Sequence, residues 1–556
     1  FMFEETHWWI AQISLMADQW LDDFFDSTRS YQIDDFAKFY KTNLNITGGP
    51  TNENVQECAT LSRLIYGLSS TYLLTGSDRY LMAAKAGVAY QREAYRSLSH
   101  DGEFCVWAYG RRPGKEGSKL VIPSENADDR GTIPLYEQIY ALAGLAQYYR
   151  ITQEWEVLED IRRTVNAFLA RYHDDEQARK RGLPGLGGYF SHLDYATMRP
   201  DSVGLGQNQS RKNWNSIGDH IPAYLVNLVL ALDPLPKGPA KGKLPQFREI
   251  CRSILKETTT LIVDKFPDPE SDFVNERFFA DWKPDHNWGW QQNRAIVGHN
   301  LKIAWNMTRV AFYYQTQAAA TTGKEKDEAR DLANKCLALA KEIGHKMAEV
   351  GLDKIRGGIY DAVERRPTNN MPTQFSWNAT KDFWQQEQGI LAYLILHGAD
   401  PGNHQWLELA RASQMFWNCF FLDRDRQGIF FRTQENGDPV VSGGYGQKAG
   451  HSVSGYHAFE LAYLAQLYTR AYVAEAGETR DFCLYYKIGA DCQQETINVM
   501  PDFFPPTHLK ITRITINGVD RTEDLKPNSD DDFQIPLLDL KAGIASELAV
   551  TFAVRA

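Results

Sequence analysis

Cysteine is scarce in this sequence, and no two cysteines form a CxxC pair. The 556 residues include seven of them, which are Cys58, Cys105, Cys251, Cys336, Cys419, Cys483 and Cys492. An odd number in so long a chain argues against a disulfide framework. We therefore expect a reducing compartment, with the cytoplasm as the location. Cys58 and Cys419 stand in helical patterns and are expected to be buried.

Long apolar runs and basic clusters are also missing. No apolar segment reaches the roughly 20 residues that a membrane-spanning helix needs, so we expect no membrane partner. The formal net charge is −11, and lysines and arginines are interspersed with acids, so nucleic acid is not expected either. The chain opens on Phe1 instead of Met, so we expect a truncated N-terminus, and the lack of a signal peptide carries little weight.

The histidines show no metal-ligand spacing. His220 follows Asp219 directly and His286 follows Asp285, so neither pair presents two ligands on one helical face as an i,i+4 pair would. We expect neither a metal nor a cofactor.

Helical periodicity, by contrast, recurs along most of the chain. Apolar residues return every three or four positions in twelve segments, which is typical of amphipathic or buried helices. The predicted helices cover residues 6–25, 56–74, 78–97, 133–150, 154–172, 215–232, 243–263, 294–315, 324–349, 382–397, 402–421 and 451–474.

Glycine followed by aromatic residues marks the loops after the odd-numbered helices. The signal occurs at residues 102–104, 187–190, 357–360 and 428–431, often near an aspartate. Each is typical of a short β-hairpin, and repetition at helix-pair intervals indicates a repeat architecture. We predict an (α/α)6 barrel over residues 1–475, with the even-numbered helices inside. An open α-solenoid is the alternative, which the long Trp- and Gly-rich loops on one side disfavour.

The pattern changes after residue 475. Residues 482–556 contain alternating strands such as 509–516, followed by the Asn517-Gly518 turn signal. We predict a small C-terminal β domain, which serves more plausibly as a lid or an oligomer contact than as a second catalytic site.

Polar and aromatic residues stand at or near the start of every predicted inner helix. In a closed ring they would meet at one mouth, and flat aromatic rings there would stack on sugar rings. The candidates are Arg63, Tyr136, Gln138, Asn215, Asp219, Trp288, His299, Trp384, Gln386 and His457.

Several of these segments resemble the N-acylglucosamine 2-epimerase family, which includes cellobiose 2-epimerases and aldose–ketose isomerases. The matching pieces are spread over the predicted barrel. They are Thr60-Leu61-Ser62-Arg63-Leu64-Ile65-Tyr66, Tyr72-Leu73-Leu74-Thr75-Gly76, Leu135-Tyr136-Glu137-Gln138, Gly298-His299, Phe383-Trp384-Gln385-Gln386 and Gly455-Tyr456-His457.

The resemblance implies an (α/α)6 barrel that moves a proton at C2 of a ring-opened reducing sugar, without metal or cofactor. It implies His299 and His457 as the acid/base pair, a task for which histidine has a suitable pKa. Arg63 would stabilise the enediolate. The pocket would be lined by Tyr136, Asn215, Trp384 and Gln386.

The sequence departs from the family's pattern at several of these places. Asp219 stands where a histidine is usual, and Gln388 stands where a glutamate is usual. Lys302 replaces a glutamate one turn after His299, and Glu460 replaces an arginine one turn after His457. We therefore hypothesise that Lys302 and Glu460 form an ion pair of reversed polarity that orients the two histidines.

Two other functions stay open. Asp219 could act with Asp129, Asp285 or Glu460 as the acid and base of an inverting glycoside hydrolase. The chain could also be a sugar-binding relative without catalysis. A monosaccharide or oligosaccharide is the expected partner and a homo-oligomer is possible, but the residues do not identify the sugar.

Overall fold

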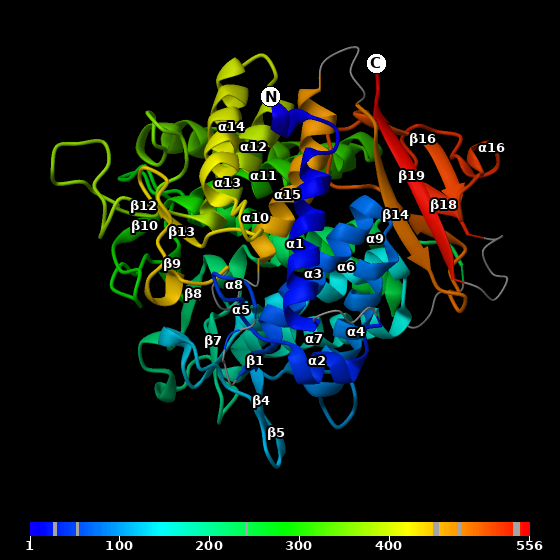
Figure 1. The fold of residues 1–556 in the computed structure, drawn as a ribbon. Helices are drawn as coiled ribbons and strands as arrows, with labels where there is room; N and C mark the ends of the chain where they lie inside the picture. The colour runs from blue at the N-terminus through cyan, green and yellow to red at the C-terminus, as the bar shows by residue number, and fades with distance from the viewer. Residues whose placement is uncertain are drawn as a thin grey trace.

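The computed structural model describes residues 1–25, 30–49, 51, 55–238, 243–448, 455–474, 480–537 and 545–556. Its helices form two concentric layers (Figure 1). The inner layer contains α3 (Cys58–Thr75), α5 (Leu135–Tyr140) with α6 (Ala143–Thr152), α8 (Trp214–Ile217) with α9 (Val226–Leu232), α11 (Val297–Ala320), α13 (Phe383–Ala399) and α15 (Tyr456–Tyr468). The outer layer contains α1 (Trp8–Phe25), α4 (Asp78–Ala94), α7 (Trp155–Ala167), α10 (Leu244–Lys265), α12 (Gly323–Val350) and α14 (His404–Phe416). The predicted (α/α)6 barrel is confirmed.

Burial separates the two layers. Every residue of α15 is buried, from Tyr456 to Tyr468. Only 10 of the 28 residues of α12 are buried, and they recur every three or four positions along one face. A helix that is apolar all round belongs in a core, whereas a one-sided stripe belongs on a surface. The start of the predicted last helix, residues 451–454, lies outside the described residues.

Short antiparallel strands link neighbouring repeats at one end of the barrel. A strand that directly precedes an inner helix pairs with a strand from a later loop, so the loops are joined around the ring. The pairs are β6 (Thr132–Pro134) with β7 (His192–Asp194), β8 (Arg211–Asn213) with β9 (Arg277–Phe279), β10 (Arg294–Ile296) with β11 (Ala362–Glu364), and β12 (Thr380–Asp382) with β13 (Arg432–Gln434). The first repeats add β1 (Gln56–Glu57), β4 (Gly110–Gly114) and β5 (Gly117–Val121) in one sheet, and β2 (Arg96–Leu98) with β3 (Cys105–Trp107). We call these strands the collar.

A repeated buried ion pair fastens the collar. Lys212 and Lys381 each lie in a strand just before an inner helix, and their ammonium groups lie 2.7 Å from Asp174 and 2.9 Å from Asp353. Lys448 pairs with Asp423 in the same way. The backbone of each aspartate is hydrogen-bonded to one of the glycine–aromatic turns that the sequence repeats, at Gly187 and Gly188, at Gly357 and Gly358, and at Gly428. The pairs of Lys212 and Lys381 therefore hold two of these turns against the start of the next inner helix.

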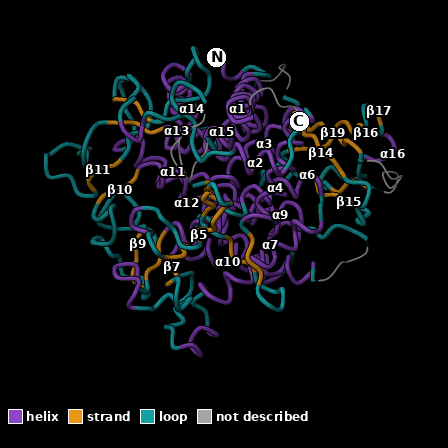
Figure 2. The backbone as a smooth tube through the Cα atoms, turned by 60° about the horizontal axis from the view of Figure 1, so that its bottom comes forward, coloured by secondary structure: helices purple, strands orange, loops and turns teal. Residues whose placement is uncertain are grey.

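The C-terminal strands lie at the opposite end of the barrel (Figures 1 and 2). A sheet runs in the order β14 (Phe482–Ile488), β19 (Ser546–Val554), β16 (Leu509–Ile516) and β17 (Val519–Asp520), and β15 (Thr496–Asn498) pairs with β18 (Gln534–Pro536). β14 alternates buried and half-buried residues and contacts α3 and α6, so its apolar face covers the carboxyl ends of inner helices. Two further helices, α2 (Ile33–Phe39) and α16 (Thr522–Leu525), are peripheral.

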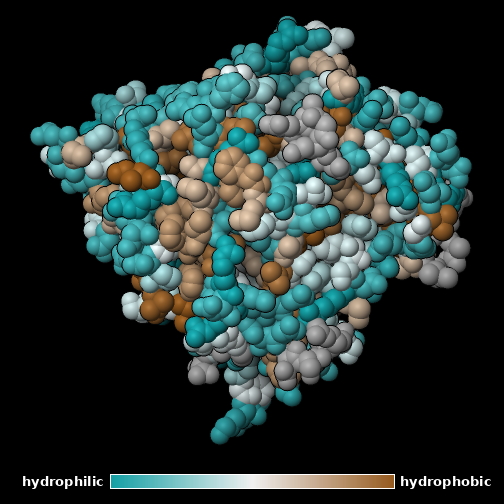
Figure 3. Space-filling view, turned by 45° about the horizontal axis from the view of Figure 1, so that its top comes forward, coloured by the Kyte–Doolittle hydropathy of each residue, from teal (hydrophilic) through white to brown (hydrophobic). Residues whose placement is uncertain are grey.

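The surface view shows hydrophobic side chains in small groups among hydrophilic ones (Figure 3). Within the described residues, no helix combines the length and apolarity needed to cross a membrane. All seven cysteines are free thiols. Cys58 is buried as expected, but Cys419 is exposed, because its turn ends an outer helix at the surface.

Candidate active site at the collar end of the barrel

His299 occupies the first turn of α11, directly after β10. The glycine before it permits a close approach of α11 to α13, since a Cβ atom on Gly298 would lie 2.6 Å from the Gln385 side chain. The Gly298 amide donates a hydrogen bond of 2.8 Å to Gln385 Oε1. Two inner helices are thereby locked together at the point where the histidine enters the barrel.

Glu276 holds the His299 ring. Its Oε1 lies 2.5 Å from His299 Nδ1, and Gln291 donates a hydrogen bond of 3.0 Å to its Oε2. Burial by itself would raise the pKa of Glu276, but His299, together with Arg277 and Gln291, outweighs burial and lowers that pKa below its ordinary value. With Nδ1 engaged by a carboxylate, Nε2 of His299 is the nitrogen left for proton transfer. The side chain remains 20% exposed, so it lies at the opening of the site.

His457 lies on α15, and its ring contacts the same indole as His299. The ring centroid of Trp384 is 5.1 Å from that of His299 and 5.9 Å from that of His457. Burial lowers the pKa of His457 well below its ordinary value, and the cations Lys302 and Arg63 lower it further. The ring is therefore neutral near pH 7. The barrel thus brings the two histidines named by the sequence to one wall.

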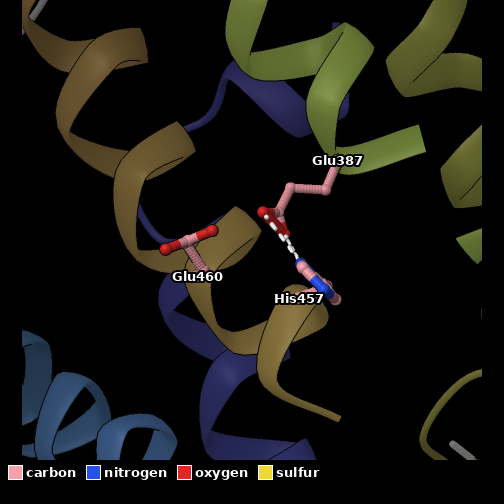
Figure 4. A group of neighbouring side chains, drawn as sticks. All are labelled: Glu387, His457 and Glu460. Atoms are coloured by element: carbon pink, nitrogen blue, oxygen red, sulfur yellow. Dashed lines mark hydrogen bonds and ion pairs between the residues drawn. The ribbon is translucent and has the colours of Figure 1, made fainter. Parts of the chain in front are cut away.

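Two buried carboxyl groups flank His457 (Figure 4). Glu387 Oε2 lies 3.3 Å from His457 Nδ1, and Glu460 accepts a hydrogen bond of 2.8 Å from the Tyr456 hydroxyl. Burial raises the pKa of Glu387 well above its ordinary value, and the neighbouring Glu460 raises it further. Since two carboxylates so close do not both ionise readily, Glu387 is the protonated member of the pair.

The same three side chains could hold a metal ion, because one ligand atom from each lies within 4.8 Å of the others. A Glu₂His set would accept a divalent cation. The charges of Lys302 and Arg63, which both act on His457, oppose a cation there. A protonated Glu387 also weakens the attraction of this position for a cation, so the charges around the site favour a proton over a metal ion.

Arg63 lies inside a cage of tyrosines. Its guanidinium carbon is 3.7 Å from the ring centroid of Tyr140, 5.1 Å from that of Tyr456 and 5.4 Å from that of Tyr136. Its Nη2 donates a hydrogen bond of 2.5 Å to the Tyr136 hydroxyl. Within the described residues, Nε and Nη1 have no hydrogen-bond partner although the side chain is fully buried. Buried donors without partners are costly, which marks these two as positions for a ligand oxygen.

Lys302 does not form the hypothesised pair with Glu460. Its ammonium group lies 2.8 Å from Asp219 Oδ1 and donates a hydrogen bond of 2.9 Å to the Tyr140 hydroxyl. Burial alone would lower the pKa of Lys302, but Asp219 and Tyr140 reverse the effect and raise it. The hypothesis of reversed polarity is therefore wrong. Lys302 and Asp219 compensate each other's charge inside the barrel.

Two glutamines have a different task from the predicted lining of a pocket. Gln138 exchanges two hydrogen bonds with the backbone of Trp107 in β3, at 2.9 and 2.8 Å. Gln386 makes the same pair of bonds with the backbone of Ile359, at 2.8 and 2.9 Å. Both side chains are buried. They anchor collar loops on inner helices, because an amide that satisfies one residue's N–H and C=O has little left for a ligand.

The remaining predicted residues divide between the site and the collar. Tyr136 and Trp384 are half-buried beside Arg63 and the two histidines, so they line the opening. Asn215 is half-buried in the first turn of α8. Trp288 is buried in the loop before β10, where its indole N–H donates a hydrogen bond of 2.9 Å to Asn208. It therefore shapes that loop.

The carboxylates suggested for hydrolysis all have partners of their own. Asp129 lies 2.6 Å from His192, and Asp285 lies 2.8 Å from Arg211. Asp219 is held by Lys302 and Glu460 by Tyr456, as described above. The carboxyl groups that the structure does bring together, Glu387 and Glu460, are closer than the roughly 6.5–9.5 Å of inverting hydrolases.

Sequence reasoning missed Glu276 and Glu387. Glu276 lies in a loop and has no spacing relation to His299, so nothing in the sequence pointed to it. Glu387 did leave a signal, since it is the single charged residue in the buried helix Phe383–Ala399, apart from a terminal histidine. An isolated acid in an apolar helix is expensive unless it has a partner.

Two hollows of about 340 and 310 Å³ lie elsewhere. One is lined by residues around β13, including Gln434 and Glu435, and the other by residues 267–274 and α12. Neither is lined by His299, His457 or Arg63, so their volume is no guide to the chemistry.

Comparison with known proteins places the fold. No protein-family model matches the chain, and no curated protein matches its sequence. A sugar epimerase from a ruminal bacterium aligns with a TM-score of 0.57 and 16% identity, over 82% of this chain and 98% of its own. A D-mannose isomerase aligns with a TM-score of 0.56 and 16% identity, over 84% of this chain and 98% of its own. A cellobiose 2-epimerase from Spirochaeta thermophila DSM 6192 aligns with a TM-score of 0.57 and 17% identity, over 82% of this chain and 97% of its own. At these identities the likeness establishes that this chain shares their barrel fold.

Proposed function

We propose that this protein is a carbohydrate 2-epimerase or aldose–ketose isomerase that moves a proton at C2 of a ring-opened reducing sugar. The observation that carries the proposal is the arrangement around Trp384. Two histidines contact this indole, each with Nδ1 facing a carboxyl group. A buried arginine, two of whose donors have no partner in the described part of the chain, lies on another inner helix. Proton abstraction next to a carbonyl needs a base, an acid and a donor for the developing oxyanion.

The two histidines take different parts in this proposal. His299 removes the proton from C2, because ionised Glu276 stabilises the imidazolium that forms. The C–H electron pair becomes the C1=C2 bond of an enediolate, and the carbonyl electrons move to O1. His457 is neutral, and the protonated Glu387 faces its Nδ1. His457 gives its Nε2 proton to the opposite face of C2 while Glu387 passes a proton to Nδ1, and the O1 electrons re-form the carbonyl, which gives the epimer. Solvent then takes the proton from His299 and restores the one on Glu387. If His299 instead returns its proton to C1 and the O2 proton moves to O1, the product is the ketose.

Arg63 stabilises the negative charge on the enediolate through Nε and Nη1. The positive ends of several inner helices meet at this end of the barrel and add to that stabilisation. Lys302 and Asp219 hold the Tyr140 hydroxyl, and the Tyr140 ring in turn supports the Arg63 guanidinium. Trp384 and Tyr136 form the wall on which the sugar stacks.

The experiment is incubation with free aldoses and reducing disaccharides in deuterated water. We expect deuterium at C2 or C1 of the sugar, detected by NMR and mass spectrometry. His299→Gln and His457→Gln should abolish incorporation, and His404→Gln on the exposed surface of α14 is the matched control. Release of a monosaccharide without carbon-bound deuterium would instead identify a hydrolase. A parallel incubation with a chelator tests whether deuterium incorporation depends on a metal ion held by Glu387, His457 and Glu460.

A further inference from the structure

We propose that Asp502, in the C-terminal β region, is a positioning residue for His457 and acts on it through Arg309 from beneath the active site. This inference rests on the proposed function and extends it to a part of the chain outside the barrel. Asp502 follows β15 and is fully buried. It lies between α11 and α15, two of the helices that carry the candidate catalytic residues.

Asp502 is held by contacts from both helices. Arg309 of α11 donates to Asp502 Oδ1 from Nη2 at 2.6 Å and from Nε at 3.1 Å. The Tyr468 hydroxyl of α15 donates to Asp502 Oδ2 at 2.6 Å. From α6, Arg150 donates to the carbonyl oxygens of Met500 and Pro501, at 3.3 and 3.2 Å. The segment 500–502 is therefore fastened to three inner helices at once.

A continuous series of contacts leads from Arg309 to the catalytic end. The Arg309 guanidinium lies 4.8 Å from the Trp305 ring centroid, and the Trp305 indole donates a hydrogen bond of 2.7 Å to Gln388 Oε1. Gln388 Nε2 then donates a hydrogen bond of 3.2 Å to Glu387 Oε1, and Glu387 faces His457. All these side chains are buried, so none of them can exchange a protein partner for bulk water.

Electrostatic interactions also connect Arg309 with the carboxyl pair beside His457. The groups that act on Glu387 or Glu460 come from three inner helices, and they are Tyr66 on α3, Lys302 and Arg309 on α11, and Tyr456 and His457 on α15. Asp502 neutralises Arg309. Without that carboxylate, the positive charge of Arg309, which acts on Glu460, would lie uncompensated near the carboxyl pair and would favour loss of the Glu387 proton.

Asp502→Asn tests the inference, with kcat, KM and their pH dependence as readouts. We expect kcat to fall about tenfold with KM within about twofold. We expect the alkaline limb of the kcat profile to move to lower pH by about one unit, because Glu387 loses its proton earlier. Arg309→Met/Asp502→Leu removes both charges from the buried pair, a replacement that cores often tolerate, and it should return the limb toward its original position.

Asn498→Ala is the matched control. Asn498 ties the same region to the barrel through the carbonyls of Ala231 and Pro234, at 3.0 and 2.6 Å, and does not touch Arg309. It should lower thermal stability and leave the kcat profile unchanged. Equal changes of the profile in both variants would overturn the inference, as would an unchanged profile in folded Asp502→Asn.

A second readout separates this inference from the proposed function. In protein with ¹³C-labelled histidine, the His457 signal is identified by its loss in His457→Gln. Asp502→Asn should shift that signal and Asn498→Ala should not. If the wild-type protein deuterates no sugar, the proposed function fails while this shift still tests the coupling. An unmoved signal in Asp502→Asn refutes the coupling itself.

Discussion

Arg63 and Arg309 are both buried on inner helices, yet they lie in opposite electrostatic situations. Arg309 is fully occupied, with Asp502 on two of its nitrogens and Asn306 on the third. Arg63 has one tyrosine hydroxyl and three aromatic rings, and two of its nitrogens have no partner within the described residues. The first arrangement holds a structure together, and the second leaves hydrogen-bonding capacity for a ligand.

The different partners of Arg309 and Arg63 follow from the groups that each end of the barrel supplies. At the carboxyl ends of the inner helices, the C-terminal strands supply a carboxylate to a cation. At the amino ends, Glu276 from a loop and Glu387 from an inner helix face the histidines, and the cation Arg63 lies among aromatic rings. A buried arginine is therefore informative about function only when its partners are counted.

The largest expected effect is on stability at Arg309. Arg309→Met would leave Asp502 buried without its cation, and we expect the free energy of unfolding to fall by about 3–5 kcal/mol. Arg63→Met removes a cation that has no carboxylate at salt-bridge distance among the described residues, so its loss of stability should be below about 1 kcal/mol. Urea unfolding measures both values. Equal losses would contradict the comparison.

For kcat we expect the reverse order, with a larger loss on replacing Arg63 than on replacing Arg309. Arg63→Met should lower kcat for C2 deuteration by about 10²–10³-fold, the usual cost of removing one oxyanion donor. Arg63→Lys should recover only part of the activity, because an ammonium group lacks the planar fork of a guanidinium. Steady-state kinetics on folded protein provide the measurement, and wild-type kcat in Arg63→Met would refute the assigned role.

The two histidine partners offer a finer version of the same comparison. Glu276→Gln removes an ionised partner of His299 and should reduce kcat about 10- to 100-fold, a part of what general base catalysis contributes. Glu387→Gln replaces an acid that is already protonated, so kcat should change by less than about threefold at pH 7. A larger loss in Glu387→Gln than in Glu276→Gln would show that the protonation states are assigned the wrong way round.

The smallest effect concerns Asp361, which lies directly before β11 and shares the Arg432 guanidinium with Asp382. Burial, with Asp382 close by, raises the pKa of Asp361 to about 7, although Arg432 lies 3.0 Å away. Because the pKa of Asp361 is higher in the folded protein than in the unfolded chain, its protonated form contributes to stability. That contribution is complete below about pH 4, the pKa of aspartate in the unfolded chain, and is lost as pH rises through about 7. Asp361→Asn should remove part of this loss, on the order of 1 kcal/mol, between pH 5 and pH 8. Thermal unfolding at both pH values measures it, and an unchanged pH dependence would argue that Asp361 is ionised throughout.

The sequence by itself determined the helices, the turns and the identity of several site residues. Periodicity of 3.6 residues and glycine-initiated turns are local properties, so they are legible along the chain. They predicted the barrel, the C-terminal strands, and the meeting of His299, His457 and Arg63 at one end. The division into two domains at about residue 475 and the roles of these residues stay predictions.

Only the tertiary structure decided the partners. Glu276 is 23 positions from His299, Glu387 is 70 from His457, and Asp502 is 193 from Arg309. No local pattern encodes such separations, because they are set by closure of the ring and by docking of the C-terminal strands. Closure of the ring also explains why Lys302 pairs with Asp219 and not with Glu460, the partner hypothesised from the sequence. Charge complementarity can be read from a sequence, but which opposite charge lies within about 4 Å is decided by the packing of inner helices.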